Sequence, residues 1–276
     1  RTPTFSRPRF SPTPHDHIHQ SELMYSRVMG ETTPPAFVQA AANPVRWRMM
    51  TLLAESDLRV RDLVALLDEP QNLVSYHLRL LRDQGLVTAR RSSFDGRESY
   101  YHLDLERCSD AVAAAGHALH PAIALNSTPP GKPKTAVVLF VCTGNSARSP
   151  MAEALLRHHT RGRVRAISAG TKPRPRQHPL VTRALREIIG VDIAEQHPRD
   201  VGSVLSHQRF DRVITLCDRA REALPQVDAH RTHWSLPDPA GGPEHESFRR
   251  FLDTAREIDA RVRHLLPLLA EERRPA

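Results

Sequence analysis

The stretch "VCTGNSARSP" (Val141–Pro150) decides the fold of the segment around it. It begins at the end of "TAVVLFV", a block of β-branched and aliphatic residues typical of a buried parallel strand. It runs into "SPMAEALLRHHT", which starts with the residue types favoured at a helix N-terminus and then has apolar residues at helical spacing. The sequence therefore predicts a strand, a tight loop and a helix, with loop amides gathered at the helix N-terminus, where anions bind.

Two side chains of this loop suit covalent chemistry on a tetrahedral oxyanion. The loop amides and the Arg148 cation favour the reactive thiolate of Cys142. The planar guanidinium of Arg148 can hold two oxygens of such an ion, and Gly144 lets the backbone curl around it. We therefore expect a nucleophile and an oxyanion clamp in one loop.

The longer stretch "VLFVCTGNSARSPMAEALLR" contains the pattern Cys-x5-Arg-Ser and resembles the low-molecular-weight protein tyrosine phosphatases and the arsenate reductases that share their fold. The resemblance implies that Cys142 is the nucleophile and that Arg148 binds the oxyanion. It implies further that Asn145 holds the loop in shape and that Ser149 hydrogen-bonds the thiolate. The family also needs an Asp-Pro pair downstream as general acid, and "HWSLPDPAGG" supplies Asp238.

The residues near this acid favour the reductase over the phosphatase. Tyrosine phosphatases of the family follow the Asp-Pro pair with two tyrosines, whereas this chain has Ala240 and Gly241. Cys217 ends the segment "TLC" as a second cysteine does in the reductases, but Leu224 stands where the thioredoxin-coupled subgroup has a third. We therefore expect an arsenate reductase, with a tyrosine phosphatase as the alternative. The second thiol is either Cys217 or an external thiol, from mycothiol, glutathione or the thioredoxin system, and no bound cofactor is expected.

Further strands and helices alternate through the rest of this half. Strands are predicted at "VRAISAG", at "DRVITLCD" and around "HRTHW". Helices are predicted at "HPLVTRALREIIG", near "RDVGSVL" and over about 244–270. This order predicts a doubly wound parallel-sheet α/β domain, with the Cys142 loop at the carboxyl edge of its first strand.

The preceding segment has the pattern of a winged helix-turn-helix. Apolar residues at helical spacing predict helices in "NPVRWRMMTLLAE", "RVRDLVALLDE" and "QNLVSYHLRLLRDQGLV", and "TARRSSFDGRESYYHLD" predicts a hairpin. The pattern resembles the ArsR family of dimeric transcriptional regulators over roughly residues 36–120. The resemblance implies a homodimer on a double-stranded DNA operator, with the third helix in the major groove. The candidate DNA-binding residues are Gln71, Asn72, Ser75, Tyr76, His77 and Arg79 in that helix and Arg97 in the wing.

The chain departs from this family at its metalloid sensor. Many members have a Cys-x-Cys pair where "RVRDL" places Arg59 and Arg61, and two cations cannot bind a metalloid. Weaker metal-binding candidates are "HDHIHQ" and the set Asp104, Glu106, His117 and His120. We predict no metal site. A competing hypothesis is a regulator whose second domain only senses oxyanions, but sensing needs no general acid such as Asp238.

Composition agrees with a protein that handles anions. The 276 residues have a net charge of +8 and a pI near 10.1, which favours a nucleic-acid partner. Three scattered cysteines indicate a reducing cytoplasm, and the sequence has neither a membrane-spanning apolar run nor a signal-peptide core. We predict a disordered tail over 1–35, a winged-helix domain over 36–122, a linker over 123–135 and the phosphatase-like domain over 136–276. We expect the linker to keep the two sites separate.

Overall fold

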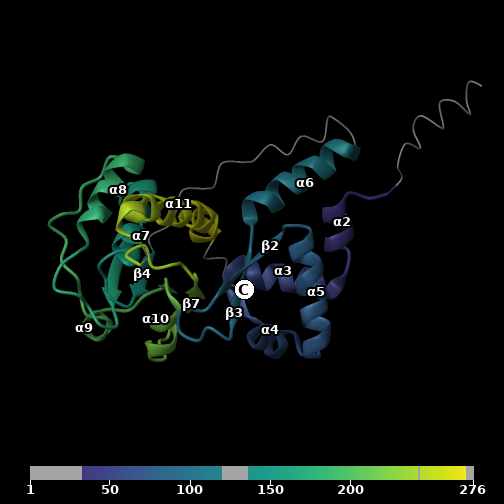
Figure 1. Cartoon of the computed structure of the whole chain (residues 1–276), viewed down its shortest axis with the longest axis horizontal. Helices are drawn as coiled ribbons and strands as arrows, with labels where there is room; N and C mark the ends of the chain where they lie inside the picture. Colours follow the sequence, from purple (N-terminus) through teal and green to yellow (C-terminus); the bar gives the residue numbers. More distant parts are fainter. Residues whose placement is uncertain (1–32, 120–135, 242, 272–276) are drawn as a thin grey trace, which may run out of the picture.

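The computed structural model describes residues 33–119, 136–241 and 243–271, which form two domains lying side by side (Figure 1). The predicted linker lies outside the described residues, as do all but the last three positions of the predicted tail. The histidine-rich hexapeptide and His120 lie outside them as well. Within the part that is described, no helix has both the length and the apolar composition needed to cross a bilayer.

The amino-terminal domain is a winged helix-turn-helix, as the sequence predicts. Its helices are α2 (Ala36–Ala41), α3 (Pro44–Glu55), α4 (Val60–Leu67), α5 (Gln71–Asp83) and α6 (Leu105–Leu119). The strands β1 (Leu58–Arg59), β2 (Val87–Arg91) and β3 (Ser99–Leu103) form an antiparallel sheet in the order β1-β3-β2. The Asn43 side chain caps α3 by accepting a hydrogen bond from the Arg46 amide at 3.1 Å. Gly85 ends the third predicted helix with a left-handed φ of +69°.

The carboxyl-terminal domain is the predicted α/β domain with an all-parallel sheet. The strands are β4 (Val137–Cys142), β5 (Arg165–Gly170), β6 (Arg212–Thr215) and β7 (His230–His233), in the order β5-β4-β6-β7. The helices are α7 (Arg148–Thr160), α8 (Pro179–Ile189), α9 (Val201–His207), α10 (Asp218–Ala223) and α11 (Ser247–Glu271), with a 3-10 turn η1 (Glu244–Glu246) before α11. Helices α7, α8 and α11 pack against one another. The central strand β4 is almost wholly buried, which explains its uninterrupted apolar sequence.

Two short helices are absent from the sequence prediction. The predicted strand "DRVITLCD" stops at Thr215, and α10 begins at Asp218 directly after Cys217. Helix α2 precedes the first predicted helix. Each has six residues, which is too short for an apolar periodicity to reveal.

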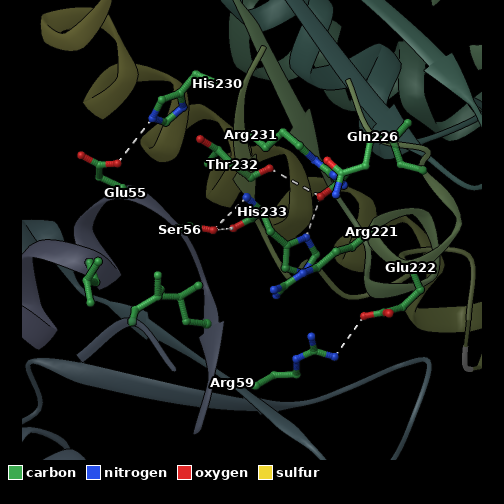
Figure 2. Close-up of a pocket in the computed structure, with 15 residues that line it drawn as sticks. Glu55, Ser56, Arg59, Arg221, Glu222, Gln226, His230, Arg231, Thr232 and His233 are labelled. Carbon is green, nitrogen blue, oxygen red and sulfur yellow. Dashed lines mark hydrogen bonds and ion pairs between the residues drawn. The ribbon is translucent and has the colours of Figure 1, made fainter. Parts of the chain in front are cut away.

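The two domains are in direct contact, which differs from the expected separation by a linker. The Asp57 amide, between α3 and β1, donates to the carbonyl of His233 at the end of β7, at 2.8 Å. In Figure 1, β7 and α10 face the winged-helix domain. Figure 2 shows the pocket between the domains, which the ion pair Arg59–Glu222 crosses at 3.0 Å. Arg59, which the resemblance to ArsR-type regulators places where many of them have a metalloid-binding cysteine, therefore joins the two domains.

Candidate active site

The Cys142 loop connects β4 to α7 at the carboxyl edge of the sheet. Cys142 is buried, and its Sγ lies 3.0 Å from the Ser149 Oγ in the first turn of α7. A hydroxyl at this distance can donate to a thiolate. The structure thus brings together the nucleophile and the hydrogen-bond donor that the sequence pattern nominates.

Asn145 fixes the middle of the loop. Its backbone is left-handed, with a φ of +46°, a conformation that Asn tolerates better than most residues. Its Nδ2 donates to Ser149 Oγ and to Ser168 Oγ, both at 2.9 Å. Its Oδ1 accepts from the Arg199 amide at 2.7 Å. All hydrogen-bonding groups of this side chain except one lone pair are engaged, so the loop has little freedom.

A buried carboxylate supports these residues from behind, and sequence reasoning missed it. Glu153, in α7, accepts from Ser168 Oγ at 2.7 Å and from Arg199 and Gln196, both at 2.6 Å. The Ser168 hydroxyl in turn accepts a hydrogen bond from the side-chain Nδ2 of Asn145. The available signal was the spacing, because Glu153 lies four residues after Ser149 and therefore on the same side of α7.

Backbone hydrogen bonds hold the segment after β5 against the Cys142 loop. The Thr171, Lys172 and Arg174 amides donate to the carbonyls of Cys142, Thr143 and Gly144 at 3.1, 2.8 and 2.9 Å, respectively. Gly170 precedes this segment, and a Cβ placed there would lie 2.8 Å from the Thr143 carbonyl oxygen. The close approach of the two segments therefore depends on glycine at position 170.

Arg148 and Asp238 face each other at the mouth of the loop. Arg148 is buried, and its Nη1 donates to the Leu236 carbonyl at 3.0 Å. Its Nη2 lies 3.7 Å from Oδ2 of Asp238, and the Asp238 side chain is 58% exposed. The Arg148 Nε is buried and has no hydrogen-bond partner among the described residues. A buried cationic donor without a protein partner is suited to an oxyanion.

Cys217 is at the same edge of the sheet, in the turn between β6 and α10. Its Sγ lies 3.3 Å from Thr143 Oγ1, and Thr143 follows Cys142 in the chain. Cys142 and Cys217 line one cleft of about 820 Å³. Leu224 stands where the thioredoxin-coupled reductases are expected to have a further cysteine, and it is buried at the end of α10. The third cysteine of the chain, Cys108, lies in α6 of the other domain, where burial raises the pKa of its thiol to about 11.

The cleft is strongly cationic and has no phenyl, phenol or indole ring in its described lining. The basic side chains along it are Arg148, Lys172, Arg174, Arg176 and Arg219. His178 lines it too, and burial lowers the pKa of that imidazole. Arginine and lysine head groups favour small anions, and a phenyl substrate would find no tyrosine, phenylalanine or tryptophan ring to sandwich it here.

The candidate DNA-binding residues do not all point outward. Gln71, Asn72, Tyr76, Arg79 and, in the wing, Arg97 are exposed, and Ser75 is half-buried. His77 differs, because it is only 6% exposed and burial lowers its pKa. It packs in the core of the domain, so the outer face of α5 offers the other five side chains without it.

No metal centre is found in the part of the chain that the structure describes, where no three His, Cys, Asp or Glu side chains form a group that could hold an ion. Asp104, Glu106 and His117 therefore do not converge. All three cysteines are free thiols.

Comparisons with known proteins agree with both family resemblances. The family "low molecular weight phosphotyrosine protein phosphatase" matches residues 137–275, and "bacterial regulatory protein, arsR family" matches residues 43–89. An arsenate reductase of Brevibacillus brevis is 36% identical over 128 residues, 46% of this chain and 90% of that protein. One of Bacillus licheniformis is 36% identical over 130 residues, 46% of this chain and 91% of that protein. Among solved structures, an arsenate reductase from Archaeoglobus fulgidus is 34% identical, with a TM-score of 0.38, covering 45% of this chain and 98% of that one.

Proposed function

Because the chain belongs to the low molecular weight phosphotyrosine protein phosphatase family, with an ArsR-type helix-turn-helix domain before the matching region, we propose that it is a DNA-binding regulator that also reduces arsenate to arsenite. The observation that carries the reductase assignment is the pair of thiols on one cationic cleft. Cys142 and Cys217 line it together with Arg148, and the described lining has no tyrosine, phenylalanine or tryptophan side chain to flank a phosphotyrosine ring.

The first step is nucleophilic attack by the Cys142 thiolate on arsenate. The loop amides and Arg148 hold the oxyanion, and the Cys142 sulfur forms a bond to arsenic(V). The bond from arsenic to one oxygen breaks, and Asp238 donates a proton so that this oxygen leaves as water. Ser149, 3.0 Å from the Cys142 sulfur, stabilises the thiolate before attack.

The second step transfers two electrons to arsenic. A second thiolate attacks the Cys142 sulfur and forms a disulfide with it. The sulfur–arsenic bond breaks with its electron pair left on arsenic, which becomes arsenic(III) and leaves as arsenite. The attacking thiol is Cys217 or an external thiol such as mycothiol, glutathione or thioredoxin, and an external thiol must in either case return the enzyme to its reduced form.

Three further parts of the proposal concern DNA binding, the oligomeric state and the cellular location. The exposed face of α5 and the wing residue Arg97 bind an inverted-repeat operator through base and phosphate contacts. Helix α6 leaves Val112 38% and Leu119 81% exposed, an apolar surface that a second copy would cover, so the DNA-bound form is a homodimer. Three free thiols suit a reducing compartment, so we place the protein in the cytoplasm.

Arsenite production by purified cysteine variants tests the enzymatic part. Wild type is supplied with arsenate and, separately, with glutathione plus glutaredoxin, mycothiol plus mycoredoxin, or thioredoxin plus its reductase. Cys142→Ser should abolish arsenite formation with every donor, and the matched control Cys108→Ser should keep wild-type rates because Cys108 lies in the other domain. Cys217→Ser then identifies the second thiol: activity retained with a small-thiol donor assigns it to that donor, and loss with all donors assigns it to Cys217. Arsenite formation by Cys142→Ser at the wild-type rate would refute the proposed nucleophile.

A further inference from the structure

Ser235 lies in the loop that carries Asp238 and holds it in place through three hydrogen bonds. Two of these bonds are made with the winged-helix domain. Its amide donates to the Asp57 Oδ2 at 2.7 Å. Its carbonyl accepts a short hydrogen bond from the Arg90 guanidinium. Its hydroxyl donates to Asp218 Oδ1 at 2.7 Å. Asp57 and Arg90 both belong to the winged-helix domain, so that domain holds both backbone polar groups of Ser235.

Asp57 is a rigid, charged acceptor. It is buried, and both its oxygens accept from Arg261 Nη1 at 3.1 Å, while Oδ1 lies 2.9 Å from His102 Nδ1. Burial alone would raise the pKa of Asp57, but Arg261 and His102 outweigh it and hold the pKa well below its usual range. The Ser235 amide therefore donates to a fixed carboxylate.

The wing itself reaches the catalytic cleft. Arg90, in β2, also forms an ion pair with Glu257 of α11 at 3.2 Å. Ser93, in the wing loop, donates to Asp218 Oδ2 from its amide at 2.5 Å and from its hydroxyl at 3.1 Å. Asp218 follows Cys217 in the chain, and Ser93 lines the same cleft as Cys142. The wing is thus part of the wall around the nucleophile.

Further contacts make this interface a specific one. The backbone of His233 makes two hydrogen bonds to the other domain. Its amide donates to Ser56 Oγ at 3.0 Å, and its carbonyl accepts from the Asp57 amide at 2.8 Å. Arg221 of α10 pairs with Asp62 of α4 at 3.0 Å. In Figure 2, His233, Arg221 and Glu222 of one domain face Ser56 and Arg59 of the other. The Tyr100 ring of β3 lies 4.7 Å from the His233 ring, centroid to centroid, and burial raises the pKa of the Tyr100 hydroxyl to about 12.

We propose that Asp57 and Arg90 are positioning residues for Asp238, a role that rests on the proposed function of Asp238 as general acid. Ser235 is three residues before Asp238, and between them the Leu236 carbonyl accepts from Arg148 at 3.0 Å. A shift of Ser235 is therefore passed both to the acid and to the oxyanion clamp. Because Arg90 lies in β2 of the wing, a movement of the wing would reach the Asp238 loop through this side chain.

The experiment compares Arg90→Ala with its neighbour Arg91→Ala, using aryl phosphates with different leaving groups as probes. Arg90 is 40% exposed at its side chain and belongs to neither apolar core, so Arg90→Ala should leave both domain cores intact. Arg91 is the matched control, because the hydrogen bonds given for it go to the wing carbonyls of Gly96 and Arg97. General acid catalysis is worth about 10²- to 10⁴-fold and matters most for a poor leaving group. Arg90→Ala should therefore slow phenyl phosphate at least about ten-fold while p-nitrophenyl phosphate changes less than about two-fold.

Equal losses with both substrates would overturn the positioning role, because a general structural defect does not distinguish leaving groups. Hydrogen exchange of the 234–240 segment gives a second test that needs no turnover. Exchange there should be faster in Arg90→Ala and in Asp57→Asn than in wild type, and unchanged in Arg91→Ala. Unchanged exchange in Arg90→Ala would also overturn the proposal. Failure of the wild type to process any oxyanion, with exchange still altered, would instead refute the proposed function and leave the loop anchor standing.

Discussion

Replacing Gly170 by Ala tests how strictly the packing behind the Cys142 loop controls activity. A Cβ at this position would lie 2.8 Å from the Thr143 carbonyl oxygen and 3.0 Å from the Asn145 amide nitrogen. Both are backbone atoms, so no side-chain rotation relieves the overlap. Ordinary contact begins near 3.4 Å, so the loop must move by about 0.6 Å at Thr143.

This displacement has two measurable consequences. Overpacking of a tight interior costs about 1–3 kcal/mol of unfolding free energy. Because misplacement by about 1 Å at a reacting group costs about 10²-fold, a shift of this size should lower kcat for arsenate at least about ten-fold. The assay is arsenite production under saturating arsenate, together with urea unfolding. Gly96→Ala is the control, because its Cβ would meet nothing within 4 Å. Wild-type kcat in Gly170→Ala would refute the claim that this contact sets the loop geometry.

Three other perturbations probe the remaining parts of the account. Ser149→Ala removes the hydroxyl 3.0 Å from the Cys142 sulfur, so arsenate turnover and alkylation of Cys142 by iodoacetamide at pH 7 should both fall about ten- to a hundred-fold; unchanged alkylation would contradict this role. Arg79→Ala should weaken operator binding, measured by fluorescence anisotropy, and reduce the salt dependence by about one counterion while arsenate turnover persists. Acidification should loosen the domain contact, because the pKa values of Asp57 and Asp218 are held below their usual range. The stabilisation they give is complete above a pH of about 4 and is lost progressively as the pH falls from there toward their lowered pKa values, so a urea midpoint that does not fall between pH 6 and pH 3 would refute this.

The conformation of the Cys142 loop could be predicted from the sequence because its parts are contiguous. The strand, the Cys142 loop and the helix are successive in the chain, so local patterns determine which residues meet. Asp238 is far away in the sequence, and the resemblance to a known family, not periodicity, pointed to it. Glu153 was missed although it lies one helical turn beyond Ser149, because an acidic residue on an expected helix is usually solvated.

The structure buries His77 and Arg59, which the sequence analysis treated as a DNA-binding candidate and as a replaced metal ligand. Val74, Leu78 and Leu81 form the buried stripe of α5, and His77 lies at helical spacing from Val74 and Leu81. Its burial was therefore available from the sequence. Arg59 was considered only as a replacement for a metal ligand, although a buried arginine requires carboxylate partners, here Asp62, Glu98 and Glu222.

The domain interface could not be predicted from the sequence. It joins Asp57 to Ser235 and Arg261, which are separated by 178 and 204 positions in the chain. No periodicity connects such distant residues, and each has an ordinary local interpretation as a turn or surface residue. The breaker-rich segment between the domains suggested independence, but linker composition carries no information about whether two folded surfaces fit together.

The measurement that tests the central claim most directly is the specificity of one wild-type preparation for arsenate against phosphotyrosine. Both substrates would use Cys142, Arg148 and Asp238, so the ratio of their kcat/KM values depends on the second thiol and on the lining of the cleft. The account predicts thiol-dependent formation of arsenite from arsenate and slow release of phosphate from phosphotyrosine, with both reactions lost in Cys142→Ser. Rapid hydrolysis of phosphotyrosine without any formation of arsenite would contradict the account and assign the domain as a phosphatase.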